Sequence, residues 1–350
     1  MQLPILQDAA ARVRTHDDTF GGPLHSSRDE WSHESGRLIR TAIILTPGGC
    51  YWDRGDEHPG CTYCAFRTPI QDATGGQPFL GVDHIEMVRT GLALVADKAD
   101  KACIFTGGSF APRDISEDGL CGMIDLIAQH PTVQHLMVES RPELLTKAFI
   151  RQCIEQLRGK QLEVAIGFET QDDTIRNGRD TEGLNKGMHR DRFEECVRML
   201  RAVDAIPSVY VMLKPWHRMT EAGAVTECIA TIEYVFRTGA KKVLLQATFP
   251  QDNSLPLATA WRAGTWTPPT FASIAQVLTK TAHLGPVMLG RFDDVPPPIA
   301  IPSGCEMCTA PMTELFEQYR RTLDRGVLTE GPDCHCPNEW KQTHGSTRTG

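Results

Sequence analysis

Short runs of β-forming residues alternate with longer helix-compatible stretches over much of the chain, and this alternation constrains the fold more than any other feature. Strands that alternate with helices are typical of a parallel sheet built from βα units. The runs that predict strands lie at 41–45, 102–105, 135–138, 164–168, 209–213 and 242–246. We therefore expect an α/β protein with six parallel strands.

The stretches between these runs predict helices that cover the sheet. They span residues 83–97, 118–129, 142–157, 191–203 and 221–238. In the fourth, Phe193, Cys196, Val197 and Leu200 recur at the three- and four-residue spacing of one amphipathic helix face. The alternation fits a doubly wound open sheet as well as a barrel, so it leaves the topology open.

The two ends of the chain differ from this alternating part. Residues 1–38 are polar with little periodicity, and we assign them to an N-terminal extension that wraps or caps the main domain. We assign residues 39–290 to the main domain. Residues 291–350 form a Cys-rich C-terminal extension, which begins with a proline-rich break and holds one expected helix near 312–325.

Charge and hydropathy limit the classes of partner. The chain has 44 acidic residues against 36 Lys and Arg, a formal net charge of −8. Proteins that bind nucleic acids neutralise phosphates with clustered Lys and Arg, so this balance favours a small-molecule substrate. No apolar run approaches the ~18 residues of a membrane span, and the N-terminus lacks the features of a secretory signal. We expect a cytoplasmic protein with no membrane partner.

The grouping of the twelve cysteines is informative. In a reducing compartment, clustered cysteines are more often metal ligands or catalytic thiols than disulfides. Five cysteines lie singly in apolar or helical patterns, where Cys acts as a small core residue: Cys103, Cys121, Cys153, Cys196 and Cys228. The other seven fall into two groups, one after the first predicted strand and one in the C-terminal extension, and we expect the chemistry there.

The first group is Cys50, Cys61 and Cys64, with ten residues between the first two and two between the last two. Loops at the carboxyl ends of barrel strands are where active sites form. Three thiolates on a [4Fe-4S] cluster leave one iron open to an external chelating molecule. Tyr63 is expected to pack on the cluster and limit the access of water. The alternative is a zinc site completed by His58 or a distant Cys, because Cys-x2-Cys is often a zinc motif.

This Cys-x10-Cys-x2-Cys pattern resembles the radical S-adenosylmethionine (SAM) superfamily, in the longer-spaced form of its Elongator-subunit-3-like members. The commonest superfamily spacing has only three residues between the first and second cysteines. This chain has ten and so departs from that spacing. The resemblance implies a partial (β/α)6 barrel in which the cluster on Cys50, Cys61 and Cys64 binds SAM through its amine and carboxylate. One electron, from a donor such as flavodoxin or ferredoxin, would then break a carbon–sulfur bond of SAM.

Two further segments follow the second and third predicted strands. Gly107-Gly108-Ser109 looks like the family's glycine-rich loop, whose backbone approaches the methionine amino group of SAM. Glu139-Ser140-Arg141-Pro142 resembles a Glu-Thr-Arg-Pro segment of the subgroup, which implies that Glu139 and Arg141 contact the ribose or carboxylate of SAM. The alternatives are an ordinary turn for the first segment and an ion pair at a helix start for the second.

The last two segments follow the fourth and fifth predicted strands. Gly167-Phe168-Glu169-Thr170, with Arg176 and Lys186 downstream, is similar to another signature of the subgroup. It implies that Glu169 accepts from SAM hydroxyls or amine, and that Lys186 or Arg176 neutralises a carboxylate. Lys214 ends the fifth strand and would face the same pocket, or else cap the strand in solvent. The resemblance covers roughly residues 40–250.

The second cysteine group is Cys305, Cys308, Cys334 and Cys336. Four thiolates suit a structural zinc site, and a second iron–sulfur cluster is another metal site that fits them. Alternatively, the thiols bind a soft substrate such as trivalent arsenic. The tail from Cys334 to Trp340 also looks like that of the radical SAM subunit of archaeosine synthase, which acts on a tRNA base.

We expect a radical SAM enzyme that modifies a small molecule in a biosynthetic pathway, and a transferase reaction is favoured. Three alternatives stay open. The first is transfer of the 3-amino-3-carboxypropyl group of SAM to arsenic, as in arsinothricin biosynthesis. The second is modification of a tRNA base, and the third is a non-catalytic zinc-binding regulator that uses both cysteine groups.

Overall fold

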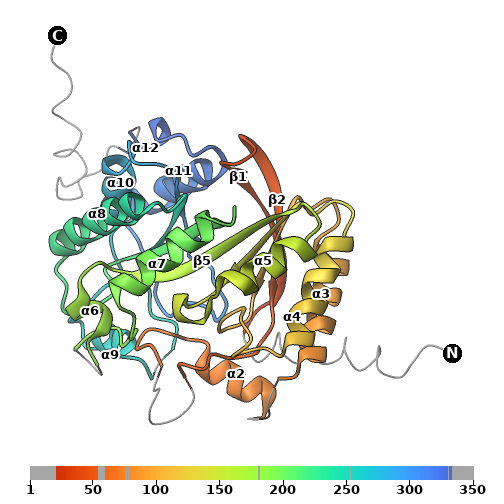
Figure 1. Ribbon diagram of the computed structural model, residues 1–350. Helices are drawn as coiled ribbons and strands as arrows, with labels where there is room; N and C mark the ends of the chain where they lie inside the picture. The colour runs from red at the N-terminus through yellow and green to blue at the C-terminus, as the bar shows by residue number, and fades with distance from the viewer. Residues whose placement is uncertain are drawn as a thin grey trace.

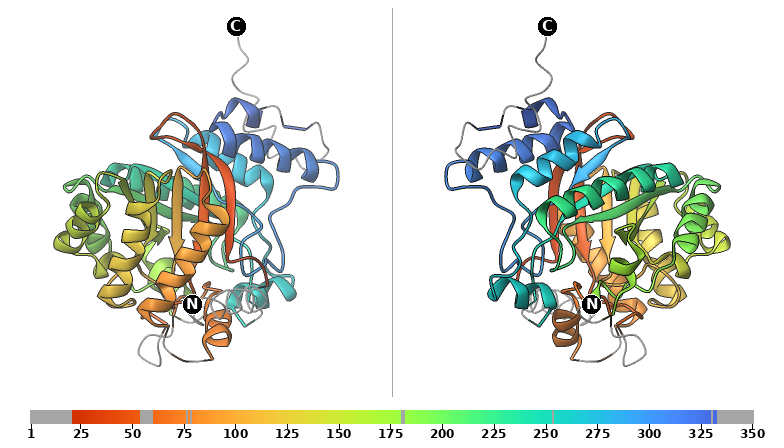
Figure 2. Two further views of the ribbon diagram at one scale, coloured as in Figure 1. Left: turned by 90° about the vertical axis from the view of Figure 1, so that its right-hand side faces the viewer. Right: turned by 90° about the vertical axis from the view of Figure 1, so that its left-hand side faces the viewer.

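The computed structural model describes residues 21–53, 60–75, 77, 79–179, 182–252, 254–329 and 331–332. A single sheet of eight strands lies at its centre, and the strands follow one another in chain order from β1 to β8. The first pair is antiparallel and every later pair is parallel. The sheet curls into a partial barrel with helices on its outer face (Figures 1 and 2). The predicted α/β partial barrel is confirmed.

The strands are β1 (His25–Ser32), β2 (Arg37–Leu45), β3 (Lys101–Phe105), β4 (His135–Glu139), β5 (Gln161–Glu169), β6 (Ile206–Leu213), β7 (Lys242–Ala247) and β8 (Val287–Leu289). The helices are α2 (Arg67–Thr74), α3 (Gly81–Val95), α4 (Glu117–Gln129), η1 (Pro142–Leu144), α5 (Lys147–Gln156), α6 (Asp173–Asn177), α7 (Arg190–Arg201), α8 (Glu221–Thr238), α9 (Pro256–Arg262), α10 (Phe271–Lys280), α11 (Thr309–Thr322) and α12 (Gly326–Thr329). Among these helices, none is both long and apolar enough to cross a bilayer.

The six predicted strands correspond to β2 through β7, and two further strands extend the sheet. The sequence of β1, His-Ser-Ser-Arg-Asp-Glu-Trp-Ser, is mostly polar, so no apolar pattern predicts it. Pairing with β2 over its whole length holds it in the sheet. β8 has only three residues, which is too short for a recognisable pattern.

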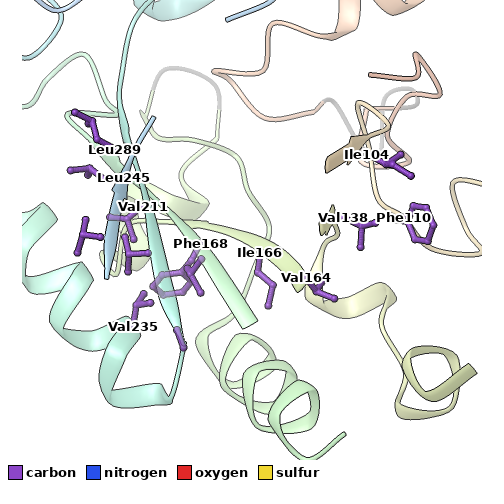
Figure 3. Packing of buried hydrophobic residues seen from close by; sticks show 14 of the residues in the cluster. Ile104, Phe110, Val138, Val164, Ile166, Phe168, Val211, Val235, Leu245 and Leu289 are labelled. Atoms are coloured by element: carbon purple, nitrogen blue, oxygen red, sulfur yellow. The ribbon is translucent and has the colours of Figure 1, made fainter. Parts of the chain in front are cut away.

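The main hydrophobic core lies between the sheet and its helices, as Figure 3 shows. Alternate strand residues point to this side because successive side chains of a strand face opposite ways. Ile104, Val138, Val164, Phe168 and Val211 are all at most 3% exposed. Burial of each such side chain contributes about 1.5–3 kcal/mol, which fixes the register of every strand against the helices.

Charged side chains fill the barrel at the amino ends of its strands. Glu163 is fully buried, and its Oε2 lies 3.1 Å from Lys101 Nζ and 3.0 Å from Lys242 Nζ. His135 lies 2.9 Å from the same oxygen. Burial raises the pKa of Glu163, but the two lysines outweigh burial and hold that pKa well below its usual value. The Glu163 carboxylate is therefore charged, and the two lysines neutralise its charge.

The β1–β2 hairpin closes this end of the barrel with two more carboxylates. Glu34 Oε1 lies 2.6 Å from Lys242 Nζ. Glu30 accepts a hydrogen bond of 2.8 Å from the Thr41 hydroxyl and lies 3.7 Å from Lys101. We call this charged end of the barrel the barrel floor; it is formed by Glu30, Glu34, Lys101, His135, Glu163 and Lys242.

Helix α11 packs against both edge strands, β1 and β8. Tyr319 donates a hydrogen bond of 2.7 Å to the Val287 carbonyl, and Arg320 donates to the Leu289 carbonyl at 3.1 Å. The helix expected near 312–325 is therefore present, beginning three residues earlier, and it covers the gap that the partial barrel leaves open.

Candidate active site

The cysteine loop leaves β2 and lies against the end of β3. The backbone N–H groups of Gly48 and Gly49 donate to the Thr106 carbonyl at 3.0 and 3.1 Å. A Cβ atom on Gly108 would lie 2.1 Å from the Gly49 oxygen and 2.8 Å from the Cys50 Cα. Glycine is therefore required at position 108, because it lets the loop after β3 touch the backbone that carries Cys50.

The three predicted cluster ligands come from this loop and the segment before α2. Cys50, Cys61 and Cys64 are each half-buried. Burial is the main cause that raises the pKa of Cys50 to about 11 and of Cys64 to about 12, and the charge of Cys61 adds to both. The thiols therefore share one electrostatic environment and would release protons when a metal binds.

Cysteine ligands are arranged differently around a cluster and around a single ion. Within the described ranges, no three His, Cys, Asp or Glu side chains converge as the ligands of one metal ion would. A [4Fe-4S] cluster instead binds each thiolate at a separate iron, so its cysteines surround the cluster without meeting at a point. His58, the alternative zinc ligand, lies outside the described residues.

Tyr63, Glu169 and Lys186 form a hydrogen-bonded group beside the cysteines, which we call the Lys186 triad. Lys186 Nζ lies 2.8 Å from Glu169 Oε1 and 2.9 Å from the Tyr63 hydroxyl, which donates to Glu169 Oε1 at 2.7 Å. Burial lowers the pKa of Lys186, but Glu169 and Cys61 outweigh it and keep that pKa above its usual value. The structure thus places a buried ammonium between a strand-end carboxylate and the cluster loop.

Arg141 joins the triad to the two aromatic residues that follow Cys50. Its Nη2 donates to the Lys186 carbonyl at 2.6 Å, and its guanidinium lies 4.6 Å from the centre of the Trp52 ring. Its Nε is bonded to Glu143, which also accepts from the Tyr51 hydroxyl at 2.5 Å. Arg141 therefore braces the cluster loop, and its ion pair with Glu143 is the alternative that the sequence left open for this segment.

The loop after β3 is tied into the same framework. Ser109 Oγ accepts from the Arg141 backbone N–H at 3.2 Å. Gly107 has a φ of 66°, the left-handed conformation that glycine adopts without strain. The structure therefore brings this predicted glycine-rich loop against the cysteine loop on one side and Arg141 on the other.

Three other predicted residues lie outside the Lys186 triad. Arg176 is fully buried and donates to the carbonyls of Thr170 and Met188 at 2.7 and 3.0 Å, so it supports the loop after β5. Lys214 pairs with Glu221 at 2.7 Å. Glu139 lies near Tyr210 inside the barrel, where burial raises the pKa of Glu139 to about 7.

Two residues to which the sequence assigns no role hold the site together. Asp114 accepts from the backbone N–H of Tyr51 at 2.9 Å and of Ser109 at 2.7 Å, so one carboxylate joins both loops. Asn185 donates from Nδ2 to the Gly60 carbonyl at 2.6 Å, and its own carbonyl accepts from Trp52 Nε1 at 2.7 Å. These contacts join segments far apart in the chain, so no local motif indicates them.

Comparison with known proteins gives relatives along the whole chain, although no family model matches it. Archaeosine synthase subunit beta of Methanosarcina acetivorans is 25% identical over 348 residues, which are 96% of this chain and 95% of that protein. The chain is a homologue of archaeosine synthase subunit beta. The subunit of Thermococcus kodakarensis is 25% identical over 176 residues, 49% of this chain and 51% of that protein. The resemblance of the C-terminal tail to archaeosine synthase thus agrees with a relative that matches along nearly the whole chain.

Two solved structures resemble this homologue of archaeosine synthase subunit beta, each with low overall similarity. The radical SAM methyltransferase TsrM of Kitasatospora setae is 17% identical with a TM-score of 0.38, over 58% of this chain and 35% of that chain. Spore photoproduct lyase is 12% identical with a TM-score of 0.37, over 63% and 58% of the two chains.

Proposed function

We propose that this homologue of archaeosine synthase subunit beta is a radical SAM enzyme that holds a [4Fe-4S] cluster on Cys50, Cys61 and Cys64. The observation that carries the proposal is that the cysteine loop, the glycine loop and the Lys186 triad meet at the carboxyl edge of one parallel sheet. When bound, the cluster supplies one electron to SAM and so breaks a carbon–sulfur bond.

The surrounding residues would bind and orient SAM. Gly108 lets the loop after β3 lie directly against the backbone that carries Cys50, so the backbone of this loop would lie beside the methionine part of SAM. Glu169 accepts hydrogen bonds from an ammonium or from hydroxyls, and Lys186 fixes the orientation of that carboxylate. Tyr63 lies between Cys61 and Cys64 in the sequence and donates to Glu169, and its ring would limit the access of water to the cluster.

For the substrate, the full-length relative supports a tRNA base, modified together with a partner subunit, because that relative is a subunit of archaeosine synthase. The net charge of −8 supports the small-molecule substrate expected from composition. A gel shift with bulk tRNA distinguishes the two. Salt-sensitive retention of tRNA supports the tRNA substrate, and no retention at low salt excludes that substrate.

The decisive experiment is anaerobic reconstitution followed by incubation with SAM and dithionite, with the SAM fragments identified by mass spectrometry. We expect 5′-deoxyadenosine and methionine from the wild type and from Cys121→Ala, and neither product from Cys50→Ala. Methylthioadenosine would instead indicate aminocarboxypropyl transfer and favour the arsenic reaction. A colourless zinc protein without SAM cleavage would overturn the proposal in favour of the regulator.

We also propose that Cys305 and Cys308 belong to a structural zinc site. Their sulfurs lie 3.4 Å apart at the start of α11, and the Cys305 backbone N–H donates to Cys308 Sγ at 3.1 Å. A Cβ on the preceding Gly304 would lie 2.4 Å from that sulfur, so glycine leaves the room it needs. Cys334 and Cys336, the other two expected ligands, lie outside the described residues.

A further inference from the structure

An interior cavity of about 80 Å³ lies on the concave face of the sheet. Its lining begins at Lys101 and Lys242, at the amino ends of β3 and β7, and no residue of the Lys186 triad belongs to it. Closed barrels fill this space with side chains. Here several residues that line the cavity are only partly buried: Phe105, Tyr210, Leu244, Gln246 and Met288.

The cavity reaches solvent at the seam between β1 and β8, the two edge strands, beside which α11 lies (Figure 1). The lining at this seam comes from both strands, the loop after β8 and α11: Arg28, Trp31, Met288, Arg291 and Arg320. The side chains of Arg28 and Arg291 are 34% and 27% exposed although they line the cavity, so they mark its mouth. We call Arg28, Arg291 and Arg320 the seam arginines.

The seam arginines have fewer carboxylate partners than charges. Arg291 and Arg320 share one carboxylate, that of Glu317, at 3.2 Å and 2.7 Å. Arg28 has one ion pair, in which its Nε lies 3.4 Å from Glu30. Three guanidinium groups therefore have two carboxylates within 4 Å in the part of the chain that the structure describes, which leaves one positive charge over.

Arg28 also has hydrogen-bond donors to spare. Its Nε donates to Glu30, and within the described ranges its two Nη atoms have no hydrogen-bond partner. Arg320 is instead held in place, since it donates to the carbonyls of Leu289 and Gly290. A guanidinium presents its N–H groups as a fork that matches two oxygens of a carboxylate or phosphate. Arg28 offers such donors at the mouth of the cavity, beside the fixed charge of Arg320.

The nearby acidic side chains do not accept from these donors. Asp29 lines the cavity but pairs with Arg40 at 3.2 Å. The carboxylates of the barrel floor lie within 4 Å of its lysines. Asp293 and Asp294, in the loop after β8, are exposed, and neither forms an ion pair with any described residue. The acceptor that would complete Arg28 must therefore come from a ligand.

The interior of the cavity has a different character from its mouth. Phe105, Tyr210 and Leu244 pack around the buried pair Cys103 and Met137, and all five residues line the cavity. Covering the partly buried members of this group would remove apolar surface from water, which favours binding. The cavity thus combines a basic mouth with an apolar interior.

We propose that this cavity binds a small molecule that carries an oxyanion, a carboxylate or a phosphate, at the seam arginines. Its apolar body would pack on Phe105, Tyr210 and Leu244. The oxyanion would accept from the unused donors of Arg28 and balance the charge that Glu317 leaves over. The inference goes beyond the proposed function, because neither the cluster cysteines nor the Lys186 triad takes part in this site.

The test uses the full-length protein, titrated in a calorimeter with phenyl phosphate, benzoate, benzamide and benzamidine at about 0.15 M salt, which screens non-specific attraction. The probes share a ring and differ in the head group. We expect phenyl phosphate or benzoate to bind at least tenfold more tightly than benzamide and benzamidine. The tighter of the two oxyanions tells whether the site takes a phosphate or a carboxylate.

Arg28→Gln and Arg291→Gln should each weaken binding of that oxyanion about tenfold, as loss of one charge-assisted hydrogen bond would. Arg89→Gln is the matched control, because Arg89 is an exposed arginine of α3 whose Nε pairs with a nearby glutamate, as that of Arg28 does. It should leave the affinity unchanged.

Three outcomes would overturn the inference: oxyanions that bind no better than benzamide, benzamidine that binds most tightly, or seam variants that bind as tightly as Arg89→Gln. Arg291 lies in a loop, so its variant remains informative if Arg28→Gln fails to fold. SAM cleavage is measured on the same wild-type preparation after reconstitution. Its absence would refute the proposed function and leave this site standing, whereas cleavage without selective oxyanion binding overturns the site alone.

Discussion

Lys186 Nζ lies within hydrogen-bonding distance of both Tyr63, at 2.9 Å, and Glu169, at 2.8 Å, so one buried ammonium joins the cluster loop to the end of β5. Glu169 adopts a φ of 67° next to an irregularity in the pairing of β5 with β6. A left-handed conformation costs a non-glycine residue about 1 kcal/mol or more. The triad offsets this strain and directs the carboxylate toward the cysteines.

Lys186→Met should slow reductive SAM cleavage about 10- to 100-fold, because it removes two charge-assisted hydrogen bonds and leaves Glu169 without its cation. Iron content after reconstitution should stay at the wild-type level, since Lys186 is not a ligand. Both are measured on the same anaerobic sample, with Lys147→Met, an exposed change in α5, as the control. Wild-type cleavage by Lys186→Met would show that the triad is only structural.

Gly108→Ala should lower the iron bound per folded chain by at least half. The added Cβ would lie 2.1 Å from the Gly49 oxygen, and this loop cannot retreat without losing its hydrogen bonds to Thr106. Gly223→Ala is the matched control, because its nearest neighbour is Thr220 Oγ1 at 3.0 Å. Circular dichroism corrects for unfolded protein. Equal iron in the two variants would contradict the close approach of the two loops.

Cys305→Ser and Cys308→Ser should each remove zinc while iron stays unchanged. The wild type is expected to carry about one zinc per chain in addition to its iron, as a four-thiolate structural site would. Elemental analysis of protein purified from zinc-supplemented cells measures both metals, and Cys121→Ser, in helix α4, is the control. If iron falls together with zinc, the pair binds a second cluster; if neither metal changes, the pair binds no metal.

The parts of the fold that follow from the sequence are those fixed by burial. Strands β2 to β7 are apolar enough on their outer face to be recognised, since that face packs on helices. β1 escaped recognition because its polar side chains face solvent and the barrel floor, and pairing with β2 is what holds it in place.

The residues of the candidate site also divide into those that the sequence indicates and those that only the structure reveals. A pattern of cysteines and strand-end residues marks Cys50 and Glu169 in the sequence, but a residue type does not reveal which way its side chain points. Arg176 lies 4.5 Å from the centre of the Phe168 ring, on the helix side of β5, because Phe168 and Glu169 face opposite ways. Asp114 bridges two loops through backbone N–H groups, a role that no local sequence pattern encodes.

Glu163→Gln should lower the free energy of unfolding by about 3 kcal/mol, because it leaves Lys101 and Lys242 buried without their shared carboxylate. The folded-state pKa of Glu163 is depressed, so its stabilisation is present above the ordinary value of 4.5 and is lost as the pH falls through the lower folded value. The difference between wild type and variant in urea unfolding should therefore be full at pH 7 and shrink below about pH 4.5. Glu195→Gln, in the exposed pair with Arg192, should change the free energy by less than about 0.5 kcal/mol. A difference that is constant from pH 7 to pH 3 would show that folding does not lower the pKa of Glu163.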